Sequence, residues 1–300
     1  MTFGKQRGAR PHETGAGAGR FRYAPVLVAL ALAATAAGGW ALAARGDGAT
    51  PATGPHRIVS LNLCSDQMVL ALADRDQIAG LTRNAIDPQM SAEAARAKGL
   101  PILRGSAEEI AAIDPDLVVG MGLSSSAALA ALPGRHYRTL ELDKTEDYPA
   151  IVASIRRVAA ALGHRDRGEA LIARMDRDLA ALPKAGGGKV AAYYQRRGYM
   201  TGTGTLVDDL MHRVGLVNLA QRLGKPALAQ LSLEEMVAAR PDYLIVESST
   251  DTVRDQGTEM LHHPALRTMR RISLPQAWTV CGSPAYVLAA RRMAEQLARR

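Results

Sequence analysis

Aromatic side chains are scarce in this chain of 300 residues, which has two Phe, two Trp and eight Tyr. Both Phe lie near the N-terminus, and Trp278 is the only Trp beyond residue 40. Three of the Tyr fall within the short segment "YYQRRGYMTGTGT" at 193–205. Such a composition argues against a binding pocket lined mainly by aromatic rings, and it draws attention to the few rings that remain.

Long runs of charge of one sign are also absent. The net charge is +8, and residues 1–44 contribute half of it through five Lys and Arg against one Glu. The remaining basic residues are scattered and are not interleaved with aromatics. This pattern excludes the basic patch that is typical of a nucleic-acid-binding protein.

Two motifs that would indicate an enzyme are missing or incomplete. No G-x-S-x-G segment is present, so a nucleophile elbow of an α/β hydrolase is not predicted. Gly202 and Gly204 begin a G-x-G pattern, but the third glycine of a dinucleotide fingerprint does not follow. We interpret these glycines as a turn, and Thr205 as the N-cap of a helix that begins at Leu206.

The N-terminal segment at 1–44 has a basic start followed by an apolar run from residue 24 to residue 44. This pattern, with small residues at its end, predicts a secretory signal cleaved near Ala43 or Ala44. An uncleaved membrane anchor is the alternative, because the run is long enough to span a bilayer. Residues 45–56 are predicted to form a flexible lead-in. Both alternatives place the folded part outside the cytoplasmic membrane, in the periplasm.

The sequence contains only two cysteines, Cys64 and Cys281. Three interpretations remain open for them: small buried apolar residues, a disulfide, or a pair of soft metal ligands. The histidines form no convincing set with carboxylates, so a metal-ion site is not predicted.

Two segments repeat each other with a constant offset of 126 residues. They are "SAEEIAAIDPDLVVG" at 106–120 and "SLEEMVAARPDYLIV" at 232–246. In each, a Ser followed three residues later by Glu predicts a capping box that begins a helix, and a Pro ends the helix. The apolar run that follows is typical of a strand buried on both faces of a parallel sheet. The repeat therefore predicts two similar lobes.

Apolar residues at helical spacing occupy the segment between the repeats. They predict one helix that ends at Gly163 and a second from about His164 to Leu182, long enough to act as a stiff spine. The predicted fold class is α/β, with two Rossmann-like lobes joined by a single long helix and a cleft between the lobes. The predicted parts are the N-terminal lobe at 57–148, the linking helices at 149–183 and the C-terminal lobe at 188–300.

Three further segments complete a familiar pattern: "RIVSLNLCSDQMVLAL", "TGTGTLVDDLMHRVGLVNLA" and "WTVCGSPAYVLAARRMAEQLA". With the repeated segments, they resemble the periplasmic substrate-binding proteins of ABC importers for vitamin B12, ferric siderophores or haem. The resemblance covers about residues 56–300. It implies a monomer that does no chemistry, has no resident cofactor, binds a corrinoid or ferric chelate between its lobes and delivers it to a membrane permease and its ATPase.

Ligands of open parallel sheets lie beyond the carboxyl ends of the strands, so the loops there are expected to line the cleft. A corrin or porphyrin is a flat apolar plate with polar rim groups. Aromatic rings would cover its faces, and arginines would pair with its carboxylates. The predicted ligand-binding residues are Cys64, Ser65, Arg83, Tyr194, Arg196, Arg197, Tyr199, Trp278, Cys281 and Tyr286.

The resemblance also implies docking on the permease through one acidic residue on each lobe, near a helix beside the cleft. Glu259 is the expected residue of the second lobe. The segment taken to match it in the first lobe, "SSSAALAAL", contains no Glu. The alternatives that stay open are a membrane-tethered sensor or a metal-ion-binding protein of the same fold, and a secreted α/β enzyme.

Overall fold

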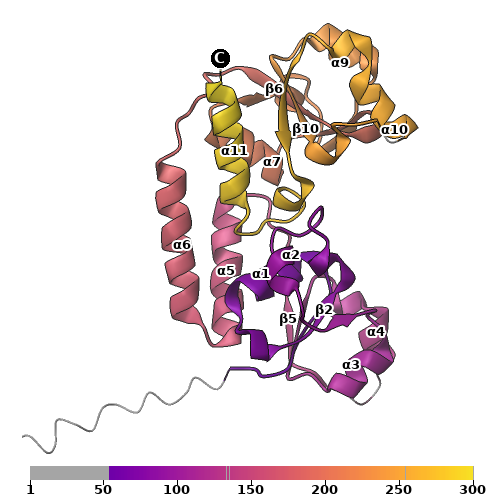
Figure 1. Ribbon diagram of the computed structural model, residues 1–300, viewed down its shortest axis with the longest axis vertical. Helices are drawn as coiled ribbons and strands as arrows, with labels where there is room; N and C mark the ends of the chain where they lie inside the picture. The colour runs from indigo at the N-terminus through magenta and orange to yellow at the C-terminus, as the bar shows by residue number, and fades with distance from the viewer. Residues whose placement is uncertain (1–53, 133, 135, 254, 300) are drawn as a thin grey trace, which may run out of the picture. The chain divides into compact units, whose positions relative to one another are not determined.

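The computed structural model describes residues 54–132, 134, 136–253 and 255–299, so the predicted export segment at 1–44 lies outside the described residues. The described part of the chain folds as two α/β lobes with two linking helices (Figure 1). None of its helices combines the length and the apolar character needed to cross a membrane.

The first lobe is built on a parallel sheet of five strands in the order β3-β2-β1-β4-β5. Its strands are β1 (Ile58–Ser60), β2 (Ile78–Thr82), β3 (Ile102–Leu103), β4 (Leu117–Gly120) and β5 (Thr139–Glu141). Its helices are α1 (Leu63–Leu72), α2 (Ala94–Ala97), α3 (Ala107–Ile113) and α4 (Ala127–Ala130). Strands and helices alternate along this lobe, which confirms the predicted α/β fold class.

The second lobe has a six-stranded sheet in which β11, β10, β6, β7 and β9 follow one another and β8 also pairs with β6. Its strands are β6 (Val190–Tyr194), β7 (Tyr199–Thr201), β8 (Val217–Asn218), β9 (Leu228–Gln230), β10 (Tyr243–Glu247) and β11 (Arg270–Leu274). Its helices are α7 (Leu206–Arg213), α8 (Leu219–Arg222), α9 (Leu233–Ala239), α10 (Gln256–Glu259) and α11 (Tyr286–Ala298). This sheet is mixed, because β7 runs antiparallel to both β6 and β9.

Two helices connect the lobes, as the sequence predicts. They are α5 (Tyr148–Leu162) and α6 (Arg165–Ala180), and the first ends at Gly163 in the left-handed conformation. The 16 residues of α6 span about 24 Å, which makes it the spine between the lobes. The terminal helix α11 packs back against α6, where Arg291 pairs with Asp178.

The repeated segments adopt the same local structure in both lobes. Ser106 caps α3 and Ser232 caps α9, each in a reciprocal capping box with the Glu three residues later, which confirms the predicted helix starts. The match extends to the other end of each helix. Asp114 and Arg240, again 126 residues apart, both end their helix with a positive φ.

The Asp of each repeated Pro-Asp pair ties a neighbouring strand to the repeat. Asp116 accepts hydrogen bonds from the backbone N–H groups of His56 and Arg57, just before β1. Asp242 likewise accepts the N–H of Val190, the first residue of β6. Each carboxylate therefore satisfies a backbone donor where the central strand of its lobe begins.

Strand β10 shows why the repeated apolar run has no alternation. Tyr243 and Ile245 point into one apolar cluster, which also contains residues of α1, α5 and α11. Leu244 and Val246 point into a second cluster on the opposite face of the sheet. Both faces are buried, as the continuous apolar run predicts.

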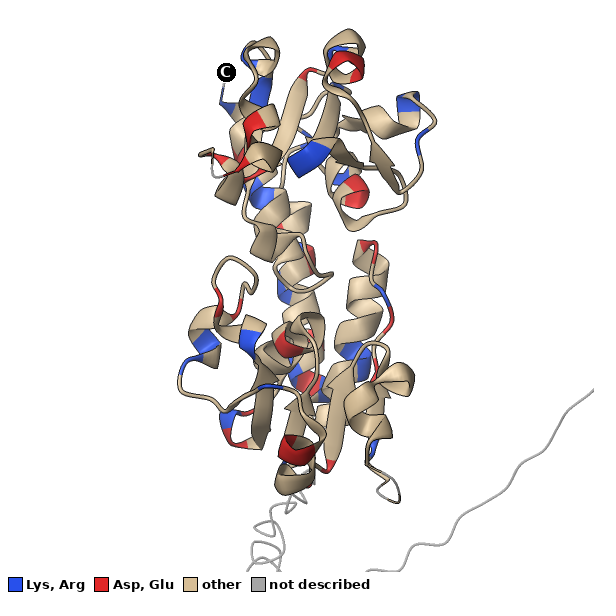
Figure 2. Cartoon of the chain, turned by 90° about the vertical axis from the view of Figure 1, so that its right-hand side faces the viewer, with Lys and Arg blue, Asp and Glu red and all other residues tan. Residues whose placement is uncertain are grey.

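Charged residues of both signs are interspersed over both lobes (Figure 2). The described surface therefore has no large region of one charge sign, and any charged binding site depends on a local group of residues.

Candidate functional site

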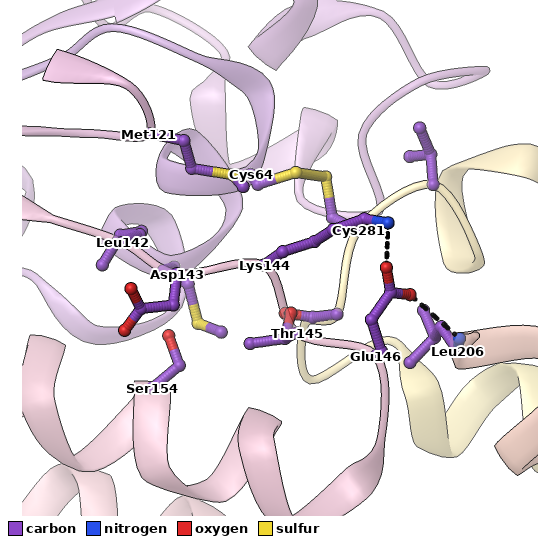
Figure 3. A pocket seen from close by; sticks show the side chains of 13 residues that line it. Cys64, Met121, Leu142, Asp143, Lys144, Thr145, Glu146, Ser154, Leu206 and Cys281 are labelled. Atoms are coloured by element: carbon purple, nitrogen blue, oxygen red, sulfur yellow. Dashed lines mark hydrogen bonds and ion pairs between the residues drawn. A yellow bond between two sulfur atoms is a disulfide. The ribbon is translucent and has the colours of Figure 1, made fainter. Parts of the chain in front are cut away.

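A disulfide joins the two lobes. Cys64 on α1 and Cys281, in the loop before α11, are bonded, with their Cα atoms 5.4 Å apart (Figure 3). No free cysteine occurs among the residues that the structure describes. Of the three interpretations open for these residues, the structure selects the disulfide, so neither thiol is available to a ligand or a soft metal. Cys64 and Cys281 thus have a structural role in joining the lobes, and their contact with a ligand stays a prediction.

Several polar contacts surround this disulfide and connect the same parts of the chain. Thr145 donates to the carbonyl of Gly282, and Ser283 donates to Gln67 on α1. Glu146 pairs with Lys144 and accepts the N–H of Leu206 at the start of α7 (Figure 3). A cavity of about 150 Å³ lies here, and its lining combines apolar side chains of Met, Leu and Val, the disulfide, and a polar segment at 143–146. It is small, and we regard it as part of the hinge between the lobes.

A larger hollow, of about 590 Å³, lies at the carboxyl ends of the strands of the second lobe. We call it the inter-lobe hollow, because Gln89 of the first lobe also lines it. The lining residues from the second lobe are Gln195, Arg196, Arg197, Tyr199, Glu247, Ser249, Thr250, Asp255, Thr258 and Gln276. Its position is the one expected for a ligand site in an open α/β sheet.

The segment "YYQRRGYMTGTGT" forms one wall of this hollow as a β-hairpin of β6 and β7, where the sequence predicts a loop. Arg197 and Gly198 at its tip have φ values of 59° and 76°. Two successive left-handed residues are typical of the tight turns that connect antiparallel strands. Left-handed geometry is unfavourable for Arg, and residues held in such geometry cluster at functional sites.

Several charged side chains of the inter-lobe hollow already have partners within the protein. Arg196 pairs with Asp255, whose carboxylate also accepts the N–H of Thr258 and thereby begins α10. The bond from the Thr258 N–H is the main reason that the pKa of Asp255 is lowered. Burial raises the pKa of Glu247, against the opposing effects of Tyr193 and Arg196. Arg196 is thus already neutralised, which weakens its predicted role as a partner for a ligand carboxylate.

Of the predicted aromatic residues, only Tyr199 presents its ring to the inter-lobe hollow, with 41% of its surface exposed. Tyr194 is fully buried, because its ring faces the core behind β6 and its hydroxyl donates to the carbonyl of Leu231. Tyr286 is also fully buried, between Tyr148 and the Arg213 guanidinium, and its hydroxyl donates to Asp209. These two tyrosines offer no ring face to a ligand, so the structure corrects both predictions.

Trp278 lies outside the inter-lobe hollow. It is partly buried and borders a separate hollow of about 430 Å³ together with side chains of α11. The prediction that it forms a face of the ligand cleft is therefore not supported by its position.

The first lobe has its own hollow, of about 540 Å³, which we call the lobe-one hollow. It is lined by Ser60, Leu61, Asn62, Leu63, Thr82, Arg83, Asn84, Leu103, Arg104 and Gly105. The predicted residue Arg83 lies here and is exposed. Ser65 does not line it: this buried residue donates to the carbonyl of Asn62 at 2.8 Å and completes the cap of α1. Ser65 therefore stabilises the first turn of α1 and does not line the hollow.

A buried carboxylate, that of Asp66, lies behind the lobe-one hollow. Its oxygens accept the N–H and the hydroxyl of Thr82, at 3.2 and 2.5 Å, and so fix the end of β2 next to Arg83. Burial raises the pKa of Asp66 to about 6, although the bonds from Thr82 and Ser60 oppose the shift. The folded protein therefore holds a proton on Asp66 at pH values where the unfolded chain has released it.

This shift gives a testable pH dependence. As the pH rises from about 4 to about 6, the Asp66 contribution should reduce the free energy of unfolding, because unfolding releases a proton. Asp66→Asn should remove that contribution, so the stability of the variant relative to the native protein should increase by about 2–3 kcal/mol between pH 4 and pH 7. Urea denaturation at several pH values measures the difference, and a constant offset at all pH values would contradict it.

Some site residues carry no signal in the sequence. Gln89 of the first lobe and Gln276 of the second lobe line the inter-lobe hollow, and neither is among the predicted ligand-binding residues. Single glutamines have no motif, and only the tertiary structure places them at the hollow. Arg104, by contrast, directly follows the strand β3, and this position at the carboxyl end of a strand predicts Arg104 and Gly105 as a cleft loop from the sequence.

Within the part of the chain that the structure describes, no group of three His, Cys, Asp or Glu side chains is arranged to hold a metal ion. The inter-lobe hollow contains donors, acceptors and one exposed ring. Such a lining can bind the polar groups at the edge of a solute.

Comparison with known proteins agrees with this geometry. The model of a family described as "Periplasmic binding protein" matches residues 58–277. The chain belongs to this family. A cobalamin-binding protein of Halobacterium salinarum is 24% identical over 204 residues, which cover 66% of this chain and 55% of that protein. The chain thus spans about half the length of the curated relatives it matches.

Solved structures of periplasmic binding proteins share the fold. A periplasmic haem-binding protein from Roseiflexus is 26% identical with a TM-score of 0.62, and the match covers 81% of this chain and all of that one. A vitamin B12-binding protein of Vibrio cholerae is 14% identical with a TM-score of 0.58, covering 81% and 96% of the two chains. The family is one of binding proteins, so this chain is a binding protein and not an enzyme.

Proposed function

We propose that this periplasmic binding protein is the exported solute-binding component of an ABC importer, and that it binds a corrinoid or a ferric chelate, including haem, in the inter-lobe hollow. Membership of the family and the likeness to B12-, haem- and siderophore-type binding proteins support this proposal. The bound solute would be passed to a membrane permease.

The observation that carries the ligand class is the exposed ring of Tyr199 in the polar lining of the inter-lobe hollow. Tyr199 on β7 is 41% exposed. Two further apolar side chains, Leu228 on β9 and Ile86 in the first-lobe segment before Gln89, are 62% and 49% exposed but are not part of this lining. Exposed apolar groups next to a polar hollow fit a ligand with an apolar plate and polar rim groups.

A ligand panel tests the proposal. Isothermal titration with cyanocobalamin, haemin and a ferric hydroxamate should give saturable binding for at least one of them. Protein purified from its host should carry the same compound, visible by native mass spectrometry and by its absorption spectrum. Absence of binding to every member of the panel would contradict the proposed ligand class.

Tyr199→Ala should weaken binding of that ligand by roughly tenfold or more, because the variant removes the one exposed ring in the lining of the hollow. The unfolding midpoint should change little, since the ring is not part of the core. Leu223→Ala is the matched control, because Leu223 is an exposed apolar residue of the same lobe that does not line the hollow. Equal ligand affinity in both variants would exclude Tyr199 from the site.

Docking on the permease is a further part of the proposal. Glu259 at the end of α10 is exposed and stays a prediction. The repeated segments supply one exposed Glu on each lobe that could serve as a docking residue. These are Glu108 in the first turn of α3 and Glu234 in the first turn of α9. Figure 1 shows α3 and α9 toward the same side of the view.

In a reconstituted importer, replacing Glu108 and Glu234 together with Gln should reduce transport at least tenfold and leave the solute affinity unchanged. Each residue is an exposed carboxyl side chain that a basic partner could contact. Glu259→Gln is the comparison. Full transport by the double variant, with loss in Glu259→Gln, would favour the docking residue predicted from the sequence.

A further inference from the structure

Two arginines lie next to each other at the edge of the first sheet. Strands β2 and β3 are parallel neighbours, and their register pairs Thr82 with Leu103. Arg83 and Arg104 are the next residues on these two strands. Paired strands are about 4.8 Å apart, so the two residues leave the sheet side by side. Both line the lobe-one hollow.

Neither guanidinium has a protein carboxylate to neutralise it. In the described part of the chain, neither Arg83 nor Arg104 forms an ion pair within 4.0 Å, although Arg57, Arg96, Arg156, Arg157, Arg167, Arg196, Arg291 and Arg292 all do. The carboxylate of Glu109 accepts the backbone N–H groups of Arg104 and Ser106, not a guanidinium N–H of Arg104. Two adjacent cations without an anion repel each other, and a bound anion would relieve that repulsion.

The surroundings of the pair leave room for such an anion and add to its attraction. Gly105 has a φ of 83°, and a side chain built on it would meet no atom within 4 Å, so the space beside Arg104 is open. Asn84 is exposed on the same rim. Helix α1 begins at this hollow with Asn62 and Leu63, and its positive end favours a negative group.

At the inter-lobe hollow Arg196 is held by Asp255, whereas Arg83 and Arg104 at the lobe-one hollow form no ion pair among the described residues. We propose that Arg83 and Arg104 form an anion subsite that binds a carboxylate-bearing rim of the solute. This inference rests on the proposed function and sharpens it. The preferred solute is one with free carboxylates, such as a porphyrin with acidic side chains or a ferric carboxylate chelate, rather than a corrinoid whose rim groups are neutral amides.

A small carboxylate tests the subsite without any plate-like ligand. Citrate titrated into the full chain should produce saturable shifts of arginine Nε–H signals in NMR spectra, and it should raise the thermal unfolding midpoint. Arg83→Gln and Arg104→Gln should each weaken citrate binding by roughly tenfold or more, since a charge-assisted, two-pronged contact is lost. Both residues are exposed, so the variants should fold.

Two further variants sharpen the result. Arg83→Lys keeps the charge but removes the planar fork, so its loss of affinity should be smaller than that of Arg83→Gln. Arg174→Gln, on the exposed surface of α6, has the same change of charge far from the hollow and should bind citrate like the native protein.

Haemin and its dimethyl ester extend the test to a plate-like ligand. The native protein should bind haemin at least tenfold more tightly than the ester, and the Arg83→Gln/Arg104→Gln double variant should not distinguish them. Equal citrate binding in the native and Gln variants would overturn the subsite, as would equal affinity of the native protein for haemin and its ester. Failure to bind any plate-like ligand would instead refute the proposed ligand class, and the citrate titration would still decide the role of the arginines.

Discussion

Replacement of Cys64 and Cys281 with Ser should lower the free energy of unfolding by about 2–5 kcal/mol. The disulfide closes a loop of 217 residues between α1 and the segment before α11, and so restricts the unfolded chain strongly. It also ties the first lobe to the second, next to the hydrogen bonds that Thr145 and Ser283 make between the same parts of the chain. Chemical denaturation of the native protein and the double variant measures the loss.

The reductant dependence separates the disulfide from the effect of the side chains. Adding a reductant should destabilise the native protein about as much as the double replacement does, and it should leave the double variant unchanged. A thiol assay on the unreduced, denatured native protein should find no free thiol. Two free thiols in that assay would show that the bond does not form.

Gly202→Ala should destabilise the protein by about 3 kcal/mol or prevent the second lobe from folding. A Cβ atom at this position would lie 1.8 Å from the carbonyl oxygen of Pro226 and 2.7 Å from its carbon. This backbone cannot move away easily, because the Gly202 N–H bonds to the carbonyl of Ala227 and the neighbouring residues Thr201 and Leu228 are paired in the β7–β9 ladder. Thermal unfolding followed by circular dichroism gives the size of the effect.

Gly204→Ala provides the comparison, since Gly204 is needed for a different reason. Its φ is 71°, but a side chain there would meet nothing within 4 Å. The cost should be about 1–2 kcal/mol, the usual penalty of a left-handed residue with a Cβ. If the two replacements proved equally mild, the close approach of Gly202 to Pro226 could not be the reason for its glycine.

Several features of the fold follow from patterns that act over short distances. The repeated Ser-x-x-Glu boxes begin α3 and α9 because each cap needs only its own first turn. The unbroken apolar run of β10 indicates burial on both faces. Gly163 ends α5 in the left-handed conformation that glycine adopts most readily. The spine helix α6 and the general position of the hollows follow from the same spacing rules.

The residues of the candidate site can be predicted only in part from such local patterns. The sequence indicates Arg83 and Tyr199, and both lie at the hollows. It gives no warning that Tyr194 and Tyr286 are buried, because a tyrosine after a strand looks the same whether its ring faces the core or the solvent. The antiparallel turn-back of β7 decides which face of the hairpin Tyr194 occupies, and the packing of α11 on α7 decides the place of Tyr286.

By itself, the sequence determined two α/β lobes, the helices between them and the absence of nucleotide and hydrolase motifs, since each depends on neighbouring residues or on a repeated local pattern. The tertiary structure alone decided that Cys64 meets Cys281, that Arg196 is neutralised by Asp255, and that Arg83 and Arg104 stand free side by side. These partners lie 217, 59 and 21 residues apart in the chain. Their contacts depend on strand register and on how the two lobes pack against each other. Neither can be predicted from local propensity or periodicity.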